Sequence, residues 1–407
     1  MRVVYLNPSG RMGGAEVALL NILAGIREVE PEWKLHLVVA DDGVVADKAR
    51  ALGVSTSVLH FPASLARLGD ASIGGPPRTE RKRLTLLRRL LFASAGGAIY
   101  TVRLRSLLRR LAPDVIHTNG FKMHILGALA KPAGVPLIWH IHDYVSTRPV
   151  MAHLVKVFRK RCSLVLANSN SVGLDVRSVC GDVLPVQTFY NGVDTVVFSP
   201  DGPTLDLDSL SGLPPSGPAV VRIGLLATLA RWKGHKTFLK ALSLIPPDIS
   251  WRGYVIGAAL YQTDGSQCSI EELKKLTQEL NISKSVGFTG FVEESASAMR
   301  FLDIVVHAST EAEPFGMVII ESMACGRALV SSASGGAAEI VDADINALSH
   351  PPGDAAVLAQ QITSLATSPD LRRRLGLEGR ATVERRFSQP RLATELIAVY
   401  QRELRYA

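Results

Sequence analysis

The sequence predicts an α/β protein with two domains, each built around a parallel sheet. Short apolar runs of strand length alternate with helix-length amphipathic segments along almost the whole chain, which is the pattern of βαβ units. The chain has 407 residues, which at about 100–200 residues per domain suggests two large domains or three smaller ones. Dense Pro and Gly punctuation at residues 199–218 separates two series of strand-like runs, so we expect the interdomain linker there. Ligands of such sheets bind in crevices at the carboxyl ends of the strands.

The predicted elements follow from hydrophobic runs and periodicity. The first domain, residues 1–198, and the second, residues 219–386, are each expected to form an open sheet. The predicted strands are residues 3–6, 35–39, 115–117, 137–141, 164–167 and 186–189, then 220–226, 251–256, 286–288, 304–307 and 328–331. The last segment, residues 387–407, contains an amphipathic helix over 389–403 with Leu392, Leu396, Val399 and Tyr400 on one face.

The net charge of +8 is concentrated in one segment. Residues 61–112, an expected helical insertion in the first domain, hold eleven Lys or Arg against two acidic residues, a local charge of +9. Within it we expect two basic helices over residues 78–110, with an apolar stretch over 90–102 that Gly96 and Gly97 interrupt. The apolar stretch 90–102 is too short to span a bilayer, but such helices can bind an anionic membrane surface. The alternative is a solvated arginine face. Phe92 and Tyr100 are the only aromatics nearby, which argues against nucleic acid.

The cysteines and the start of the chain indicate a reduced compartment. Cys162, Cys180, Cys268 and Cys325 lack the spacing of a metal site or redox motif, and no leader-like apolar run follows Met1. We expect a cytoplasmic protein without disulfides. The Asp206/Asp208 and Asp342/Asp344 pairs could suggest a metal-dependent transferase, but both lie in loop-like segments, and we expect no catalytic metal.

The most informative stretch runs from Ser309 to Gly326. A strand should end near His307, Pro314 suits the first turn of a helix, and Gly326 can end it in a left-handed cap. The helix N-terminus can then bind a phosphate, while Glu313 at its mouth and Glu321 about two turns inside can accept hydrogen bonds from sugar hydroxyls. In the alternative interpretation, Glu313 only stabilises the helix N-terminus and Glu321 is solvated.

At this point the chain resembles the retaining GT-B glycosyltransferases of family 4, which carry two glutamates eight positions apart in an E-P-F-G-x-x-x-x-E string. Six further stretches resemble motifs of that family in the same order: residues 10–16 (GRMGGAE), 140–143 (HIHD), 190–194 (YNGVD), 232–235 (WKGH), 288–291 (FTGF) and 335–341 (GGAAEIV). The resemblance implies two Rossmann-like domains facing a central cleft. It also implies an acceptor on the first domain, a nucleotide-sugar donor on the second, and a C-terminal helix that crosses back to the first.

The resemblance also implies roles for individual residues. Catalysis would involve His142, Glu313 and Lys233. The loop at Gly13 and Gly14 would approach a phosphate or the acceptor. The residues in contact with the donor would be Glu321, Arg231, Thr228, Phe315, Gly316, Met317, Val318, Gly290 and Phe291. Glu321 would hold the ribose, Glu313 the transferred sugar, and Lys233 the diphosphate. The family's usual Arg is replaced by Thr228, so that either Arg231 takes its place or Lys233 and helix N–H groups act alone.

The expected function is the transfer of a hexose from a UDP- or GDP-linked donor, with retention of configuration at the anomeric carbon. Neither a metal nor a cofactor is expected to take part. His142 would position the reactants, and the departing phosphate oxygen would accept the acceptor's proton. The acceptor would be a glycan or a lipid-linked sugar of polysaccharide, glycolipid or cell-envelope biosynthesis, reached in the cytoplasm or at the inner face of the membrane. The alternative is a catalytically degenerate relative that acts as a basic membrane-binding module. GT-B epimerases lack the E-P-F-G string, phosphorylases are far longer, and the G-x-G-x-x-G loop of dehydrogenases is absent.

Overall fold

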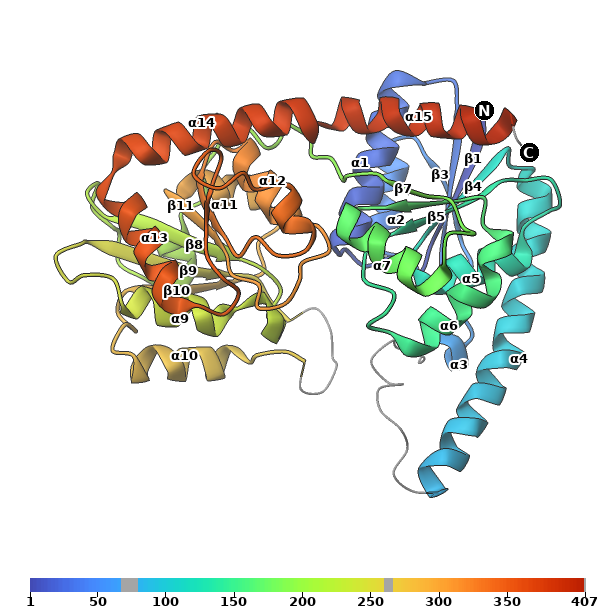
Figure 1. Ribbon diagram of the computed structural model, residues 1–407, viewed down its shortest axis with the longest axis horizontal. Coiled ribbons are helices and arrows are strands. Elements are labelled where there is room, and N and C mark those ends of the chain that lie inside the picture. Colours follow the sequence, from blue (N-terminus) through green and yellow to red (C-terminus); the bar gives the residue numbers. More distant parts are fainter. Residues whose placement is uncertain (67–79, 260–265, 406–407) are drawn as a thin grey trace. The chain divides into compact units, whose positions relative to one another are not determined.

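The computed structural model describes residues 1–66, 80–259 and 266–405 (Figure 1). The chain forms two compact units, Met1–Gly192 with Gln389–Ala407, and Val193–Ser388. Each unit contains a parallel sheet with helices, so the predicted α/β class is confirmed.

The first unit has a parallel sheet of strand order β3-β2-β1-β4-β5-β6-β7. Its strands are β1 (Arg2–Asn7), β2 (Lys34–Val39), β3 (Ser55–Val58), β4 (Val115–Asn119), β5 (Leu137–Ile141), β6 (Leu164–Ala167) and β7 (Val186–Thr188). Its helices are α1 (Gly14–Val29), α2 (Val44–Ala51), α3 (Ala63–Ala66), α4 (Glu80–Leu111), α5 (Phe121–Ala130), α6 (Pro149–Phe158), η2 (Arg159–Arg161), α7 (Asn170–Cys180) and α15 (Gln389–Arg405). Central strands covered on both faces read as continuous apolar runs, which is why β1 and β5 were predictable.

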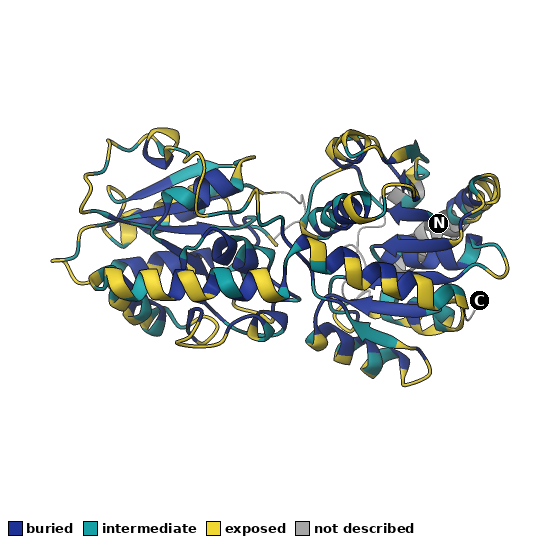
Figure 2. Cartoon of the chain, turned by 90° about the horizontal axis from the view of Figure 1, so that it is seen from above, coloured by how far each residue is buried: buried dark blue, intermediate teal, exposed yellow. Residues whose placement is uncertain are grey.

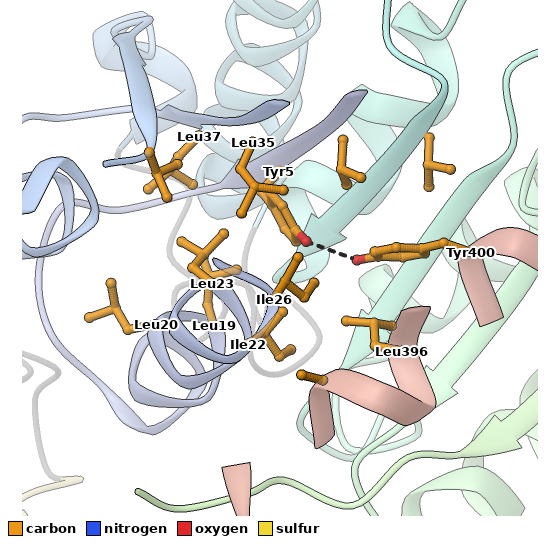
Figure 3. Packing of buried hydrophobic residues seen from close by; sticks show 14 of the residues in the cluster. Tyr5, Leu19, Leu20, Ile22, Leu23, Ile26, Leu35, Leu37, Leu396 and Tyr400 are labelled. Carbon is orange, nitrogen blue, oxygen red and sulfur yellow. Dashed lines mark hydrogen bonds between the residues drawn. The ribbon is translucent and has the colours of Figure 1, made fainter. Parts of the chain in front are cut away.

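The C-terminal helix α15 packs on the first unit, in agreement with the prediction that the end of the chain returns to the first domain. It contacts α1, and Leu392, Leu396 and Tyr400 enter the same hydrophobic cluster as Leu19 and Ile22 of α1 (Figure 3). The Tyr400 hydroxyl group donates a hydrogen bond to the Tyr5 hydroxyl group at 3.2 Å. A buried stripe along α15 alternates with exposed positions (Figure 2). The predicted amphipathic helix is therefore confirmed.

The basic segment differs from the prediction of two helices. Helix α4 is continuous through Gly96 and Gly97. Two interior glycines cost about 1 kcal/mol each, and burial of Tyr100, Leu104 and Leu108 in a cluster shared with α5 offsets that cost. Arg78 and the side chains of residues 80–95 lie outside the described residues. No helix in the described part of the chain is both long and apolar enough to span a membrane.

The second unit has a parallel sheet of strand order β10-β9-β8-β11-β12-β13. Its strands are β8 (Val221–Leu226), β9 (Trp251–Ile256), β10 (Val286–Gly290), β11 (Ile304–His307), β12 (Ala328–Ser331) and β13 (Leu348–Ser349). Its helices are α8 (Leu207–Ser211), η3 (Arg231–Lys233), α9 (His235–Ser243), α10 (Ile270–Glu279), α11 (Ser295–Phe301), α12 (Met317–Ala324), η4 (Gly336–Glu339), α13 (Ala355–Thr367) and α14 (Pro369–Arg386).

Residues 199–218, where the sequence predicts a linker, pack on the second unit. The Leu205 N–H donates to the Ser297 carbonyl, and α8 lies against β10. Asp208 accepts hydrogen bonds from Arg252 and Tyr254, both at 2.7 Å. Pro and Gly therefore mark an ordered surface segment here. Of the Asp206/Asp208 pair, the Asp208 carboxylate is therefore hydrogen-bonded to residues of the fold.

Strand order reverses in each sheet, and this places the functional loops. In the first sheet β1 lies between β2 and β4; in the second, β8 lies between β9 and β11. Crevices open at the carboxyl ends of the strands that flank such a reversal. The loops after β1, β4, β8 and β11 are therefore the first places to look for a site.

Candidate active site

The loops after β8 and β11 bring together two residues that are 80 positions apart. The Lys233 ammonium group lies 2.9 Å from Oε1 and 2.7 Å from Oε2 of Glu313. Both side chains are mostly buried, with 19% exposure for Lys233 and 8% for Glu313. The structure thus joins two of the predicted catalytic residues at the reversal point of the second sheet, where a ligand crevice is expected.

Three further groups fix the Glu313 side chain and backbone. Ser309 donates a hydrogen bond from its hydroxyl group to Oε2 at 2.8 Å, and Nε2 of His307 lies 3.1 Å from the same oxygen. The Glu313 N–H donates to the Ser334 carbonyl. Burial alone would raise the Glu313 pKa, but the charge of Lys233 and the hydrogen bond from His307 outweigh it and hold the pKa below its usual range. Glu313 is therefore an ionised carboxylate that can only accept hydrogen bonds, as a sugar-hydroxyl contact requires.

Sequence reasoning gave no role to His307 and Ser309 beyond the end of a strand. Both are buried, with 4% and 0% exposure, and both reach the Glu313 carboxylate. A signal existed, because His307 directly follows the apolar run Ile304–Val306 and Ser309 comes two positions later, at the carboxyl end of a buried strand. Polar residues at that position commonly face a ligand crevice.

Helix α12 begins later than the sequence predicts. Pro314 was expected in its first turn, but the helix starts at Met317, and Pro314 lies in the preceding loop. Gly316 caps the helix with φ 105°, a left-handed conformation that favours glycine. Glu313 is held in a bridge with Gly335, so the chain turns into the helix only after Gly316. Gly326 has φ 64°, which confirms the predicted left-handed end of the helix.

The loop before α12 presents backbone to the site. Phe315 is 2% exposed, and its ring packs on Phe387 with centroids 5.9 Å apart. Its side chain therefore belongs to the interior of the second unit. Met317 and Val318 form the first turn of α12, whose N–H groups have no intrahelical acceptor. This arrangement fits the predicted contact of a diphosphate with main-chain N–H groups.

Glu321 is the fifth residue of α12, one turn from its start and not two as predicted. Among the described residues none donates a hydrogen bond to its carboxyl group, and Ile320 and Ser322 beside it are buried. Burial raises the Glu321 pKa to about 7. A carboxyl group in this state is stabilised by hydroxyl donors from a ligand.

The β8–α9 loop sets the position of Lys233. Gly234 has φ 76°, and a Cβ atom there would lie 1.8 Å from the Ala308 carbonyl oxygen, so that only glycine fits. Helix α9 starts at the next residue, which confirms that Gly234 opens a helix. The Lys233 ammonium group also lies 4.0 Å from the centroid of the Trp232 ring, a cation–π distance.

The structure gives Arg231 an acidic partner. Its guanidinium group pairs with both carboxylate oxygens of Glu272 of α10, at 3.0 and 3.1 Å. Lys236 reaches the same carboxylate at 2.6 Å. Thr228 is half-buried in the loop after β8. Of the two basic residues expected at the diphosphate, Lys233 therefore contacts the Glu313 carboxylate, while Arg231 is held toward α10.

Gly290 and Phe291 lie at the carboxyl end of β10. Gly290 has φ 73°, and a Cβ atom there would meet nothing within 4 Å. The Phe291 side chain is 60% exposed, unusual for a ring of this size. An exposed ring at the ligand-binding edge of the sheet fits the predicted contact with the donor.

The remaining predicted residues belong to the first unit. His142 follows β5, and its ring lies 4.0 Å from the ring of His140, centroid to centroid. Burial lowers the His142 pKa to about 3, so the ring is neutral and suited to polar positioning. Gly13 precedes α1 in extended conformation, and a Cβ atom on Gly14 would meet nothing within 4 Å. In the parts of the chain that are described, no group of three His, Cys, Asp or Glu is placed to hold a metal ion.

Comparisons with known proteins agree with this geometry. Residues 12–197 match the family Glycosyltransferase Family 4, and residues 221–382 match Glycosyl transferases group 1. The alpha-maltose-1-phosphate synthase of Mycolicibacterium smegmatis is 26% identical over 379 residues, covering 86% of this chain and 95% of that protein. The lipopolysaccharide core biosynthesis glycosyltransferase LpsE of Rhizobium meliloti is 30% identical over 43% of this chain and 47% of its own.

Solved structures show the same fold. The crystal structure of Anabaena Alr3699/HepE in complex with UDP has a TM-score of 0.78 and 23% identity, covering 98% of this chain and 100% of that one. The two family matches together span most of the sequence, one on each unit. The chain therefore belongs to glycosyltransferase family 4, whose members are retaining glycosyltransferases of the GT-B fold that use nucleotide-sugar donors.

Proposed function

We propose that the protein transfers a hexose from a UDP-sugar to a hydroxyl group of a cell-surface glycan or glycolipid. The observation that carries the donor site is the pair of glutamates. Glu313 is ionised and clamped beside Lys233, whereas Glu321, eight residues later, has a raised pKa and no hydrogen-bond donor among the described residues. The solved relative with UDP supports uridine as the base, and the lipopolysaccharide relative supports a surface glycan.

In this proposal each residue meets a different part of the donor. Glu321 accepts hydrogen bonds from the ribose hydroxyls, and Phe291 lies against the base. Lys233 and the N–H groups of residues 316–318 bind the diphosphate, and Glu313 accepts from hydroxyls of the transferred sugar. Stabilising the charge that develops on the leaving diphosphate lowers the barrier to its departure. His142 of the first unit positions the acceptor.

Nucleotide binding tests the donor site directly. Thermal unfolding is measured with UDP, GDP, ADP and dTDP for the wild-type protein, Glu321→Gln and the control Glu293→Gln, whose side chain is exposed in the same unit. A ligand at about 100 times its Kd stabilises the fold by about 2.7 kcal/mol. We expect UDP to stabilise the wild type and the control, and Glu321→Gln to lose the shift. No shift with any nucleotide in the wild type would contradict the proposal.

A second proposal concerns the outer face of α4. Ile99 and Val102 are 58% and 69% exposed, and Arg103, Arg109 and Arg110 are exposed on the same helical face. The buried residues Tyr100, Leu104 and Leu108 lie on the opposite face. Apolar and basic side chains side by side are typical of helices at an anionic membrane surface. We infer that this face binds the inner leaflet and brings the enzyme to a lipid-linked acceptor.

A further inference from the structure

The groups around the Glu313 carboxylate differ in how easily they can move. Lys233 stands on a short 3₁₀ turn, has a flexible four-carbon stem and is 19% exposed. His307 is the last residue of β11, and Ser309 follows two positions later; both are buried. Lys233 is therefore the more mobile partner of Glu313, whereas His307 belongs to the sheet and Ser309 to the buried start of the loop that follows it.

The His307 ring is itself held in a defined orientation. Its Nδ1 atom lies 3.1 Å from the Ser331 hydroxyl oxygen and 3.3 Å from that of Ser332, both on or beside β12. The Ser331 oxygen accepts from the Ala333 N–H, so its own proton is available to His307. Because the Glu313 carboxylate accepts only, Nε2 must carry a hydrogen, and in the neutral ring Nδ1 then accepts. Ser331, His307 and Glu313 thus form a chain of directed hydrogen bonds.

A diphosphate would compete with Glu313 for Lys233. An ammonium group is drawn toward the denser negative charge of a diphosphate, and a long lysine side chain can follow it. Glu313 would then lose its ion pair at the moment when it has to meet the sugar. The carboxylate would still accept hydrogen bonds from Ser309 at 2.8 Å and His307 at 3.1 Å.

We propose that His307 and Ser309 are positioning residues that hold the Glu313 carboxylate in place for the donor sugar when Lys233 turns to the diphosphate. This inference rests on the proposed function, because it assigns the sugar contact to Glu313. Neither residue touches the donor; each acts through Glu313. Small displacements of a positioning group are costly, since a shift of about 1 Å can reduce a rate about 100-fold.

The test separates the sugar from the nucleotide. Kd values for UDP and for UDP-glucose, UDP-galactose and UDP-N-acetylglucosamine are measured for the wild type, His307→Phe, His307→Gln, Ser309→Ala and Glu313→Gln. The UDP-sugar whose affinity falls most in Glu313→Gln is then followed. We expect His307→Phe to weaken this UDP-sugar about 10-fold with UDP unchanged within twofold, and Ser309→Ala to act in the same direction. His307→Gln, which can still donate to Glu313, should recover most of the affinity.

A double variant shows whether His307 acts through Glu313. If it does, His307→Phe adds no further loss in a Glu313→Gln background. The control is His153→Phe, because His153 is exposed on α6 of the first unit. Equal loss of UDP and UDP-sugar, additive losses, or no effect of Glu313→Gln on any UDP-sugar would overturn the inference.

A crystal structure of the ligand-free His307→Phe protein tests the geometry without a donor. We expect the Glu313 carboxylate to leave its present position in His307→Phe and to keep it in His307→Gln. An unmoved carboxylate in His307→Phe would overturn the inference. A wild-type protein that binds no nucleotide would overturn the proposed function instead, and this crystallographic comparison would still decide the role of His307.

Discussion

The hydroxyl group of Tyr400 lies 2.8 Å from Nδ1 of His117, which links the last helix of the chain to the middle of the first sheet. Both side chains have 0% exposure. Burial lowers the His117 pKa to about 3, so the ring is neutral and only one of its nitrogens carries a hydrogen. Because the Tyr400 hydroxyl group donates its single proton to Tyr5, Nδ1 of His117 is the donor in this contact and the Tyr400 oxygen accepts. The contact anchors α15 to β4 as well as to α1.

We therefore expect Tyr400→Phe to destabilise the protein although the ring is kept. Loss of the hydroxyl group leaves a buried imidazole nitrogen unsatisfied, which costs about 1–3 kcal/mol. Tyr400→Ala should cost about 3–5 kcal/mol, because it also opens a cavity in the cluster of Figure 3. Urea unfolding measures both values. The control Gln401→Ala, exposed on the same helix, should change stability by less than about 0.5 kcal/mol. Equal stability of Tyr400→Phe and wild type would show that the hydrogen bond contributes nothing.

UDP affinity should depend on pH through Glu321. The Glu321 pKa is raised to about 7 in the free protein, and ribose hydroxyls favour the ionised form, so UDP binding and ionisation promote each other. The apparent affinity for UDP is then proportional to the fraction of the protein in which Glu321 is ionised. This makes UDP binding at pH 6 about tenfold weaker than at pH 8. Calorimetric titration at both pH values measures the ratio.

Glu321→Gln is the control for the titration of UDP itself. The affinity of this variant for UDP should be lower than that of the wild type. It should change with pH only through the ionisation of the nucleotide phosphate. The free energy of unfolding of Glu321→Gln, compared with that of the wild type, should be more favourable at pH 8 than at pH 5.5. The reason is that a raised carboxyl pKa lowers the stability of the wild type as the pH rises from about 4.5 to about 7. A wild-type pH profile parallel to that of the variant would refute the role of Glu321.

Much of the fold could be predicted because the sheets are buried on both faces. Each predicted strand corresponds to a strand of the structure, since continuous apolar runs such as Leu164–Ala167 give a strong signal. Two strands were missed. β3 (Ser55–Val58) has three hydroxyl side chains in four residues, and β13 (Leu348–Ser349) is only two residues long, so neither has a hydrophobic pattern.

The site was predictable as a set of residues but not as a network. The spacing of Glu313 and Glu321 pointed to a hydroxyl-binding helix, yet the start of α12 depends on the bridge between Glu313 and Gly335, which is a long-range contact. The contact of Lys233 with Glu313 likewise depends on which strands are neighbours in the sheet. The pairing of Arg231 with Glu272 depends on how α10 packs. Local sequence carries none of this information.

The ion pair between Lys233 and Glu313 should stabilise the free protein. Removing one partner of a largely buried pair leaves an uncompensated charge, which costs about 3–5 kcal/mol. We expect Lys233→Met to lose about 3 kcal/mol at pH 7. The double variant Lys233→Met/Glu313→Gln should lose less than the sum of the two single variants, because it removes both charges. Urea unfolding at pH 7 measures all three; additive losses would mean that the two charges do not interact.

The pH dependence of the same variants has a defined sign. A carboxyl group whose pKa is lowered by folding stabilises the protein above its unfolded pKa, near 4.5, and this contribution disappears as the pH falls. Without Lys233 the Glu313 pKa should rise, so Lys233→Met should recover relative to the wild type as the pH is lowered from 7 to 4. A constant difference between the two proteins over this range would contradict the assignment.

Vesicle binding tests the outer face of α4. The combined variant Arg103→Gln/Arg109→Gln/Arg110→Gln should sediment less with phosphatidylcholine vesicles that contain about 30 mol% phosphatidylglycerol. Its affinity for the vesicles should fall roughly fivefold for each charge removed. Ile99→Ser/Val102→Ser should reduce binding as well, because it removes apolar area that would enter the interface. High salt should release the wild type, since exposed charges are screened.

The matched control removes the same charge from the second unit. Arg373, Arg374 and Arg385 are exposed on α14, and replacing all three with Gln lowers the net charge by the same amount as the α4 variant. If the outer face of α4 is the contact surface, this control should sediment like the wild type. Equal losses in both variants would show that vesicles attract the protein only through its net positive charge. Unchanged sedimentation of the α4 variant would identify its arginines as a solvated face.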